Sequence, residues 1–273
     1  MALIRVSNLK PLPGKPRTLA GIRANVGIQA AYRAELDALI TAMHDDIVKT
    51  LTAKYRANTP ELAMDKSPAA ILNEAMGKLS RKWQSEFNRL GPKLAKHFAT
   101  KTAKRSDASL KAALRKSGLT ITFRMTRAMN DALQAVIAEN VGLIKSIASE
   151  HLTDVQGILM RSVSRGGDLG QMSKELQKRY GLTKERAALI ARDQNSKANS
   201  VIVRVRQQEA GITTAIWMHS TAGKHPRPTH VANNGKPYAI AEGWYDPAEG
   251  KKIWPGEAIN CRCFSRAVIP GLS

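Results

Sequence analysis

The fold is decided by the segment from Arg127 to Val163, which reads RAMNDALQAVIAENVGLIKSIASEHLTDVQGILMRSV. Its apolar residues recur at spacings of three or four, which is the periodicity of an amphipathic helix. The stripe consists of Leu133, Val136, Ile137, Val141, Ile144, Ile147, Ala148, Leu152, Val155, Ile158, Leu159 and Val163. We therefore predict a helix of about 30 residues, which Gly166-Gly167 ends because glycine favours helix C-termini.

Two further helices are predicted upstream of this segment. Residues 26–51 carry a similar apolar stripe, which the sequence Asn58-Thr59-Pro60 breaks. A second helix is predicted to begin with Ser67 as N-cap and Pro68 at the first helical position. Gly91-Pro92 is predicted to stop this second helix, because proline removes a backbone donor and clashes with the preceding turn.

The chain beyond these helices is less regular. Ser117-Gly118 predicts a break before residues 119–123, which read either as a short strand or as the lead-in to another helix. A short helix near residues 171–180 is predicted to stop at Gly181. A longer helix is predicted from Lys184 to about Glu209.

After Gly211 the composition changes. Residues 212–219 are rich in Thr, Ile and Trp and predict a strand, and residues 263–269 predict a second one. The stretch between them is rich in Gly, Pro, His and Asn, which indicates loops. The predicted fold class is mainly α, with a helical body that carries a small, loop-rich α+β module at the C-terminal end.

The predicted domains follow these boundaries. Residues 1–25 contain three prolines, two glycines and several basic side chains, and they read as an extended basic arm, disordered alone and ordered on a partner. Residues 26–127 form a basic helical region. Residues 128–273 form a C-terminal domain, with helices over 128–210 and the α+β module over 211–270.

Charge is the strongest compositional signal. The chain has 43 Lys and Arg against 22 Asp and Glu, a net charge of +21, and residues 78–127 hold fourteen basic residues against two acidic ones. Such an excess favours double-stranded DNA, bound without sequence preference, as the partner; an acidic protein is the alternative. The predicted DNA-binding residues are Lys82, Arg89, Lys93, Lys96, Lys101, Lys104, Arg105, Lys111, Arg115 and Lys116.

A second basic group lies on the last predicted helix. Arg192, Lys197, Arg204 and Arg206 spread around this helix at about 100° per residue, so we expect them to be solvated. No segment reaches the ~18–20 apolar residues of a membrane span, and the first residues lack the apolar core of a secretory signal. With only two cysteines, both near the end, no disulfide framework is expected, which suits a reducing cytoplasm.

The C-terminal half carries motifs in a fixed order. They are Ala191-Arg192-Asp193, Asn195, Asn199, Trp217, His230, Asn234-Gly235, Pro255-Gly256-Glu257 and Cys261-Arg262-Cys263. Over about residues 139–270 this arrangement resembles the head-morphogenesis domain of tailed-phage minor capsid proteins, the phage Mu protein F-like family. The chain departs from the family at residues 191–195, where an "ArTet"-like phrase is usual, and at residues 222–225, where an acidic residue is frequent.

The resemblance implies a structural rather than an enzymatic role. Members of the family are minor capsid proteins, present in few copies inside the head, that associate with the portal protein and the genome. They assist head assembly, packaging or DNA delivery. The resemblance thus implies a virion location in the capsid interior, the host cytoplasm during assembly, and scaffold or major capsid protein as further partners.

His230, Cys261 and Cys263 are candidate ligands for a structural zinc ion. Cysteine and histidine are the residues that structural zinc sites use, and such a site needs four ligands. His219, His225 or Asp246 could supply the fourth. Two alternatives stay open, namely thiols buried as small apolar groups and a redox or intermolecular bridge.

A metal-dependent nuclease, or another DNA-processing enzyme, is the alternative function. His230 could act as a general base with Glu257 or Asp246 as the orienting carboxylate. The acidic residues between Trp217 and Cys263 show no spacing that is diagnostic of a metal-dependent nuclease, so no catalytic residue is predicted.

The remaining motif residues are predicted to be architectural. Residues 233–236 read as a hairpin turn, and Pro255-Gly256 as a further turn. Trp217, Trp244 and Trp254 are expected to pack beneath the loops, with a stacking platform for nucleic acid as the alternative.

Overall fold

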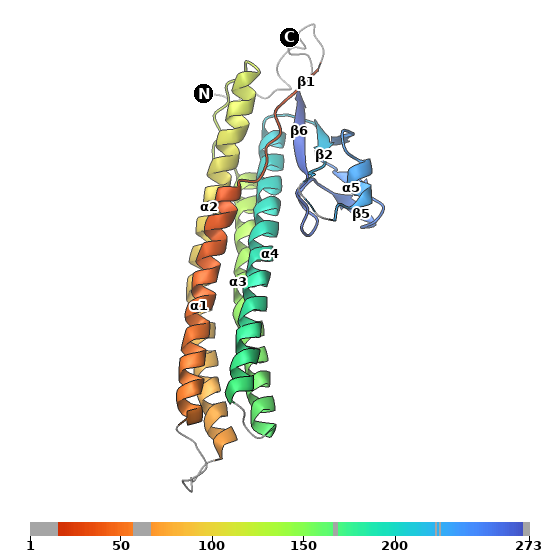
Figure 1. Cartoon of the computed structure of the whole chain (residues 1–273). Helices are drawn as coiled ribbons and strands as arrows, with labels where there is room; N and C mark the ends of the chain where they lie inside the picture. Colours follow the sequence, from red (N-terminus) through yellow and green to blue (C-terminus); the bar gives the residue numbers. More distant parts are fainter. Residues whose placement is uncertain (1–15, 57–66, 166–168, 222, 224, 270–273) are drawn as a thin grey trace. The chain divides into compact units, whose positions relative to one another are not determined.

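The computed structural model describes residues 16–56, 67–165, 169–221, 223 and 225–269 (Figure 1). Four long helices make up most of this part, and they are α1 (Val26–Arg56), α2 (Pro68–Lys116), α3 (Arg127–Ser164) and α4 (Leu169–Glu209). Short strands and the small helix α5 (Pro228–Ala232) follow α4. The predicted fold class, mainly α with a small α+β C-terminal module, is confirmed.

The chain forms two compact units. The helix unit consists of residues 30–96 and 138–191, and the sheet unit consists of the described parts of residues 1–29, 97–137 and 192–273. Within the described residues, no helix is both long and apolar enough to cross a membrane.

In the helix unit, four helical segments lie side by side (Figure 1). On α1 the buried residues are three or four apart, so one face of the helix enters the core; the apolar ones are Tyr32, Leu36, Ile40, Met43, Ile47 and Leu51. Two polar contacts join neighbouring helices inside this apolar core. The Tyr32 hydroxyl donates to Asn140 Oδ1 at 3.0 Å, and His151 Nδ1 lies 2.9 Å from Thr183 Oγ1.

The predicted stop at Gly91-Pro92 is wrong, because α2 continues through both residues to Lys116. Pro92 is exposed, so its ring projects away from the core. Gly91 is buried, and a Cβ there would make van der Waals contact with Ile144 Cγ2 at 3.4 Å, so α3 packs directly beside this part of α2. Packing on both sides of the proline, at Phe87 and Ala95, offsets the cost of about 3 kcal/mol for a proline inside a helix.

The predicted stop at Gly181 is also wrong, because α4 is continuous from Leu169 to Glu209. An exposed glycine inside a helix costs only about 1 kcal/mol. Leu176, Thr183 and Ala187 are buried on one face across this point, and that burial outweighs the cost.

The sheet unit contains a four-stranded antiparallel sheet in the order β1-β6-β2-β3. Its strands are β1 (Arg17–Thr18), β2 (Thr214–Met218), β3 (Pro237–Ala239) and β6 (Phe264–Ile269), and a separate hairpin pairs β4 (Trp244–Asp246) with β5 (Lys251–Ile253). The strands predicted over residues 212–219 and 263–269 are confirmed as β2 and β6. Ala215 and Trp217 alternate into the core of this unit.

The N-terminal arm is only partly described, since residues 1–15 lie outside the described part of the chain. Arg17 and Thr18 pair with Ile269 and Val268 of β6, and Leu19 and Ile22 are buried. Residues 17–22 therefore pack against the chain's own sheet unit. Residues 119–123, for which strand and helix both stood open, form neither; Leu119, Ile121 and Phe123 pack against the sheet-unit core.

Candidate functional site

The structure brings His230, Cys261 and Cys263 together in the sheet unit. His230 lies on α5, and the two cysteines lie in the loop that leads into β6. All three are buried, and their ligand atoms lie within 4.8 Å of one another. His230 Nδ1 is 3.4 Å from Cys261 Sγ and 3.7 Å from Cys263 Sγ. The cysteines are free thiols, so the site presents two sulfur donors and one nitrogen donor to a common point.

Helix α4 holds the loop that carries the cysteines. The backbone N–H of Asn260 donates to Asp193 Oδ1 at 2.7 Å, and Arg192 Nε donates to Asn260 Oδ1 at 2.8 Å. Asn260 has a φ of 62°, a left-handed conformation that asparagine tolerates. The Arg192-Asp193 motif thus fixes the backbone one residue before Cys261.

A glycine permits the close approach on the other side of this loop. Gly256 has a φ of 91°, and a Cβ there would lie 3.2 Å from the carbonyl oxygens of both Cys263 and Ser196. A side chain at this position would therefore push the loop away from α4. The Pro-Gly-Glu motif consequently has a geometric reason to contain glycine.

Asp246 orients the imidazole of His230. Its Oδ2 lies 3.1 Å from His230 Nε2, and its Oδ1 accepts the backbone N–H of Ala248 at 3.0 Å. Asp246 is fully buried at the end of β4. Because Nε2 faces this carboxylate, Nδ1 is the ring nitrogen that faces the sulfur atoms.

The contacts within the cluster favour the charged forms of His230 and Cys261. Burial opposes the charged form of His230, but contacts with Cys261 and Asp246 outweigh it, so the pKa of His230 is raised. A hydrogen bond from Cys263, helped by His230, lowers the pKa of Cys261 despite its burial. The pKa of Cys263 is raised, because it donates to Cys261 and is itself buried. Of the two thiols, Cys261 is thus the one that more readily becomes a thiolate.

The acidic residues considered for a nuclease have separate partners. Glu242 pairs with Lys252 at 2.7 Å, Glu249 lies 3.9 Å from Arg227, and Glu257 accepts the backbone N–H of Trp254 at 2.9 Å. Among the described residues, only the His230, Cys261 and Cys263 group brings ligand atoms this close together. The arrangement of carboxylates that two-metal nucleases use is not found in the described part of the module.

The turn at residues 233–236 differs from the predicted hairpin, because it joins helix α5 to β3 rather than two strands. Gly235 has a φ of 79°, as a turn glycine can adopt. Its N–H donates to Trp217 O at 2.8 Å, and Asn234 Oδ1 accepts the N–H of His219 at 2.9 Å. The Asn-Gly motif therefore fixes the end of β2.

The three tryptophans of the module contact its core. Trp217 is fully buried, with its ring 5.1 Å from the rings of both His230 and Trp244. Trp254 Nε1 donates to Ile240 O at 2.8 Å. Trp244 and Trp254 are partly buried and pack against the core of the sheet unit.

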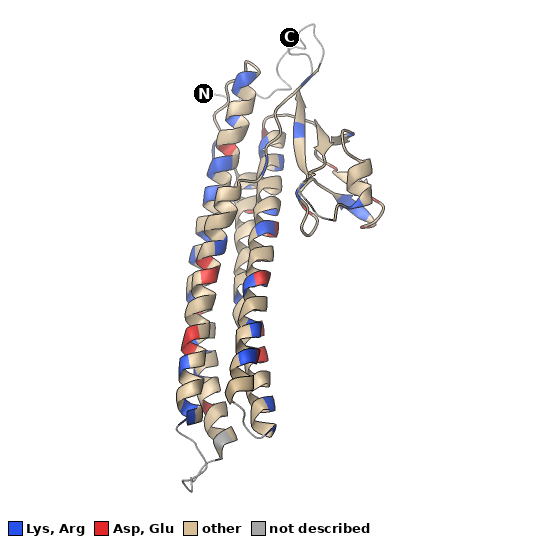
Figure 2. Ribbon diagram, in the orientation of Figure 1, with Lys and Arg blue, Asp and Glu red and all other residues tan. Residues whose placement is uncertain are grey.

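The ten basic residues predicted to bind DNA all lie on α2, and all are exposed. Figure 2 shows Lys and Arg positions along the ribbon of this helix in blue. Two of them have carboxylate partners, since Lys82 lies 2.8 Å from Asp46 and Arg89 lies 2.5 Å from Glu86. Within the described residues, the other eight form no ion pair. Their positive charge is therefore available to a partner.

The four basic residues of α4 that were expected to be solvated are all at least partly buried. They are Arg192, Lys197, Arg204 and Arg206. Arg206 is buried, with its side chain only 3% exposed. The Arg204 guanidinium lies 3.9 Å from the centre of the Trp254 ring, and Lys197 pairs with Asp193 at 3.0 Å. The prediction of solvated side chains is wrong for Arg206, which is buried, whereas the other three are half-buried. Spacing around a helix cannot reveal which faces are covered by segments distant in sequence.

Two buried asparagines have roles that the sequence did not reveal. Asn195 Nδ2 donates to Asn25 O at 3.1 Å, and Asn199 Nδ2 donates to Ile22 O at 3.2 Å. They hold the backbone that follows β1. Their position among the buried residues of α4 is the signal that could have indicated such a role, because a buried amide needs a partner.

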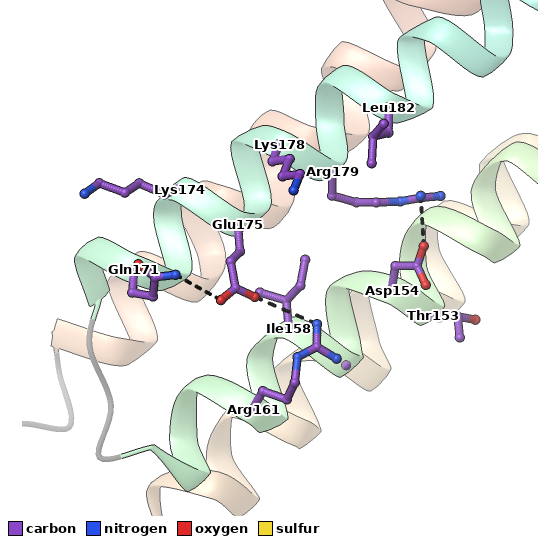
Figure 3. A pocket seen from close by; sticks show the side chains of 11 residues that line it. Thr153, Asp154, Ile158, Arg161, Gln171, Lys174, Glu175, Lys178, Arg179 and Leu182 are labelled. Atoms are coloured by element: carbon purple, nitrogen blue, oxygen red, sulfur yellow. Dashed lines mark hydrogen bonds and ion pairs between the residues drawn. The ribbon is translucent and has the colours of Figure 1, made fainter.

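A groove between α3 and α4 of the helix unit has mixed charge (Figure 3). Its two carboxylates already have partners. Asp154 pairs with Arg179 at 2.9 Å, and Glu175 lies 3.8 Å from Arg161 and accepts from Gln171 Nε2 at 3.2 Å. Neither of the two carboxylates that line the groove is therefore free to act as a general acid or base.

Comparison with known proteins agrees with the sequence motifs. Residues 153–266 match the family model described as phage Mu protein F like protein. An uncharacterized protein of Haemophilus influenzae is 27% identical over 268 residues, which are 96% of this chain and 58% of that protein. This chain therefore spans little more than half the length of that relative. No solved structure matches. The matched residues contain β2, α5 and the whole His230, Cys261 and Cys263 cluster, and in this part the chain is similar to the phage Mu protein F-like family.

Proposed function

We propose that this chain is a minor head protein of a tailed phage or prophage, which lies inside the capsid near the portal. There it assists head assembly, DNA packaging or DNA delivery, and it contacts both the portal protein and double-stranded DNA. The match of residues 153–266 to the phage Mu protein F-like family carries the proposal. The basic surface of α2, outside the matched residues, supports the contact with DNA.

The arrangement of charge on α2 suits a phosphate backbone. In the sheet unit Lys104, Lys111 and Arg115 are seven and four residues apart, so they lie on one side of the helix. In the helix unit Lys82, Arg89, Lys93 and Lys96 follow the same kind of spacing. Phosphate contacts need exposed, uncompensated cations and no base-specific geometry.

The experiment measures binding of the full chain to a DNA duplex over a range of salt concentrations. We expect binding without sequence preference, and log affinity that falls linearly with log salt. The triple variant Lys104→Glu, Lys111→Glu, Arg115→Glu should lower affinity at least about tenfold. It should also reduce the salt slope by about 3, since each phosphate contact contributes about 0.9.

A matched control separates a local contact from bulk charge. Lys145, Lys174 and Lys178 are exposed on α3 and α4, and changing all three to Glu alters the net charge by the same amount. If this control weakens binding as much as the α2 variant, α2 is not the contact surface. If the unchanged chain does not bind DNA at low salt, the DNA contact is refuted.

The head location has its own test. Mass spectrometry of purified phage particles should find peptides of this chain, and disruption of its gene should reduce the yield of filled heads. Particles that lack the protein altogether would contradict the proposed role.

A further inference from the structure

We propose that His230, Cys261, Cys263 and His219 bind one structural zinc ion, which stabilises the sheet unit. The inference concerns the stability of this unit, and it does not depend on the proposed contacts with DNA or portal. It rests on interatomic distances, on burial, and on the orientation of one imidazole.

The distances between donor atoms suit a tetrahedral ion. With Zn–S of about 2.3 Å and Zn–N of about 2.0 Å, a nitrogen and a sulfur on the same ion are roughly 3.5 Å apart. His230 Nδ1 lies 3.4 Å from Cys261 Sγ and 3.7 Å from Cys263 Sγ. Both nitrogen–sulfur distances therefore match ligands on one ion, and the two sulfur atoms lie within 4.8 Å of each other.

The second nitrogen of His230 supports the same assignment. Histidines that bind zinc usually donate their other N–H to a carboxylate, which fixes both the tautomer and the ring orientation. His230 Nε2 lies 3.1 Å from Asp246 Oδ2, and Asp246 is fully buried. Asp246 is thus a positioning residue, which leaves the fourth ligand to another side chain.

His219 is the fourth ligand in our assignment. It follows β2 directly, and its Nδ1 lies 3.7 Å from Cys263 Sγ. Its backbone N–H is held by Asn234 Oδ1 at 2.9 Å. His225, the other histidine considered, is exposed. The ring of His219 stands outside the group of three whose ligand atoms lie within 4.8 Å of one another, so it would move towards the ion. Two cysteines and two histidines would then form a closed site, which is the arrangement of a structural rather than a catalytic zinc.

Such an ion would join segments that have little regular structure of their own. Strands β3, β4 and β5 have three residues each, and α5 has five. The ligands come from α5, from the end of β2 and from the loop before β6. A metal in this position contributes folding free energy that a small module cannot obtain from its core alone.

The test begins with the unmodified full chain, purified without chelator. Elemental analysis should find about one zinc per chain. Replacement of zinc by cobalt(II) should give the visible bands of a tetrahedral ion and a thiolate-to-metal charge-transfer band in the near ultraviolet. Removal of zinc by a strong chelator should lower the melting temperature of the sheet unit, followed by tryptophan fluorescence, and added zinc should restore it.

Three variants, two of them with matched controls, test the ligands and the role of Asp246. Cys261→Ser should abolish the charge-transfer band or shift it strongly. His219→Ala should change the cobalt bands away from those of a closed tetrahedral site, whereas His225→Ala, at the exposed histidine, should not. Asp246→Asn should weaken zinc affinity by about 10- to 100-fold, and the exposed Asp131→Asn should leave it unchanged.

Several results would overturn the assignment. Zinc-free protein that takes up neither zinc nor cobalt would refute the site, and so would a Cys261–Cys263 disulfide in the protein as purified. Cobalt bands that change with His225→Ala but not with His219→Ala would refute the fourth ligand. These measurements use the unmodified chain first, so a variant that fails to fold does not leave the question open.

Discussion

Arg206 holds both carboxylate oxygens of Asp107, with Nε–Oδ1 at 2.8 Å and Nη2–Oδ2 at 2.9 Å, and so ties α4 to α2 within the sheet unit. The same guanidinium donates to Glu209 Oε2 and to the carbonyl of Arg124, both at 2.7 Å. It also lies 4.9 Å from the centre of the Phe123 ring. One buried cation therefore fixes the loop between α2 and α3.

Replacing this cation should destabilise the sheet unit. Arg206→Met leaves two carboxylates without their partner, and breaking a buried pair in this way costs about 3 kcal/mol of unfolding free energy. Urea denaturation followed by tryptophan fluorescence measures the change. The control Arg127→Met, at a side chain 96% exposed, should change the free energy by less than about 0.5 kcal/mol. Equal effects of the two variants would contradict the role given to Arg206.

The helix unit should lose stability as the pH falls from 6.5 towards 4. His151 is fully buried, and burial, with the positive charges of His44 and Arg179, lowers its pKa from 6.5 to about 4. The Thr183 hydroxyl donates to Arg179 O, so His151 Nδ1–H donates to Thr183 and Nε2 lacks a partner among the described residues. Protonation would create a buried, unpaired N–H.

The sign and size of this effect follow from proton linkage. Between the folded and unfolded pKa values the unfolded chain binds more protons, so unfolding free energy decreases as pH falls. From pH 7 to pH 5 His151 should account for a loss of about 2 kcal/mol. The loss should be smaller in His151→Gln but unchanged in His97→Gln, an exposed position. Denaturation curves at both pH values measure it; an unchanged loss in His151→Gln would contradict the prediction.

Gly256→Ala should destabilise the sheet unit by about 3 kcal/mol, because the left-handed φ and the contact with two carbonyl oxygens both oppose a Cβ. Gly118→Ala is the matched control, since Gly118 has a φ of 80° but open space around the new methyl group. The control should cost only about 1 kcal/mol. Thermal unfolding of both variants measures the difference, and equal losses would show that the close approach to Ser196 and Cys263 is unimportant.

Much of this fold can be predicted from the spacing of apolar residues, because each long helix buries one stripe. The beginning of α2 at Pro68 was also predictable, since Ser67 Oγ accepts the N–H of Ala70 at 3.2 Å. The stops predicted at Pro92 and Gly181 were wrong because the free-energy cost of a proline or glycine inside a helix does not by itself decide where the helix ends. Contacts with residues far away in sequence, such as Ile144 beside Gly91, decide it.

The candidate metal ligands could be predicted from the sequence, but the residues that position them could not. Residue type alone indicated His230, Cys261 and Cys263, which the structure brings together. The orienting role of Asp246 depends on the β4–β5 hairpin, whose short strands carry little sequence signal. Asp193 contacts the residue before Cys261 across 67 positions of sequence, and no local pattern encodes such a contact.

The pairing of β1 with β6 has a consequence for biosynthesis. Arg266 Nε donates to Leu19 O across 247 residues, and β6 lies between β1 and β2 in the sheet. A ribosome delivers Leu19 and Ile22 early, but the strand that pairs with β1 emerges only after α1 to α4 have been made. Before β6 is made, only the α2 and α4 part of this core, which includes Leu110, Leu114 and Val203, can cover these apolar side chains. The four-stranded sheet can form only when synthesis has passed Ile269.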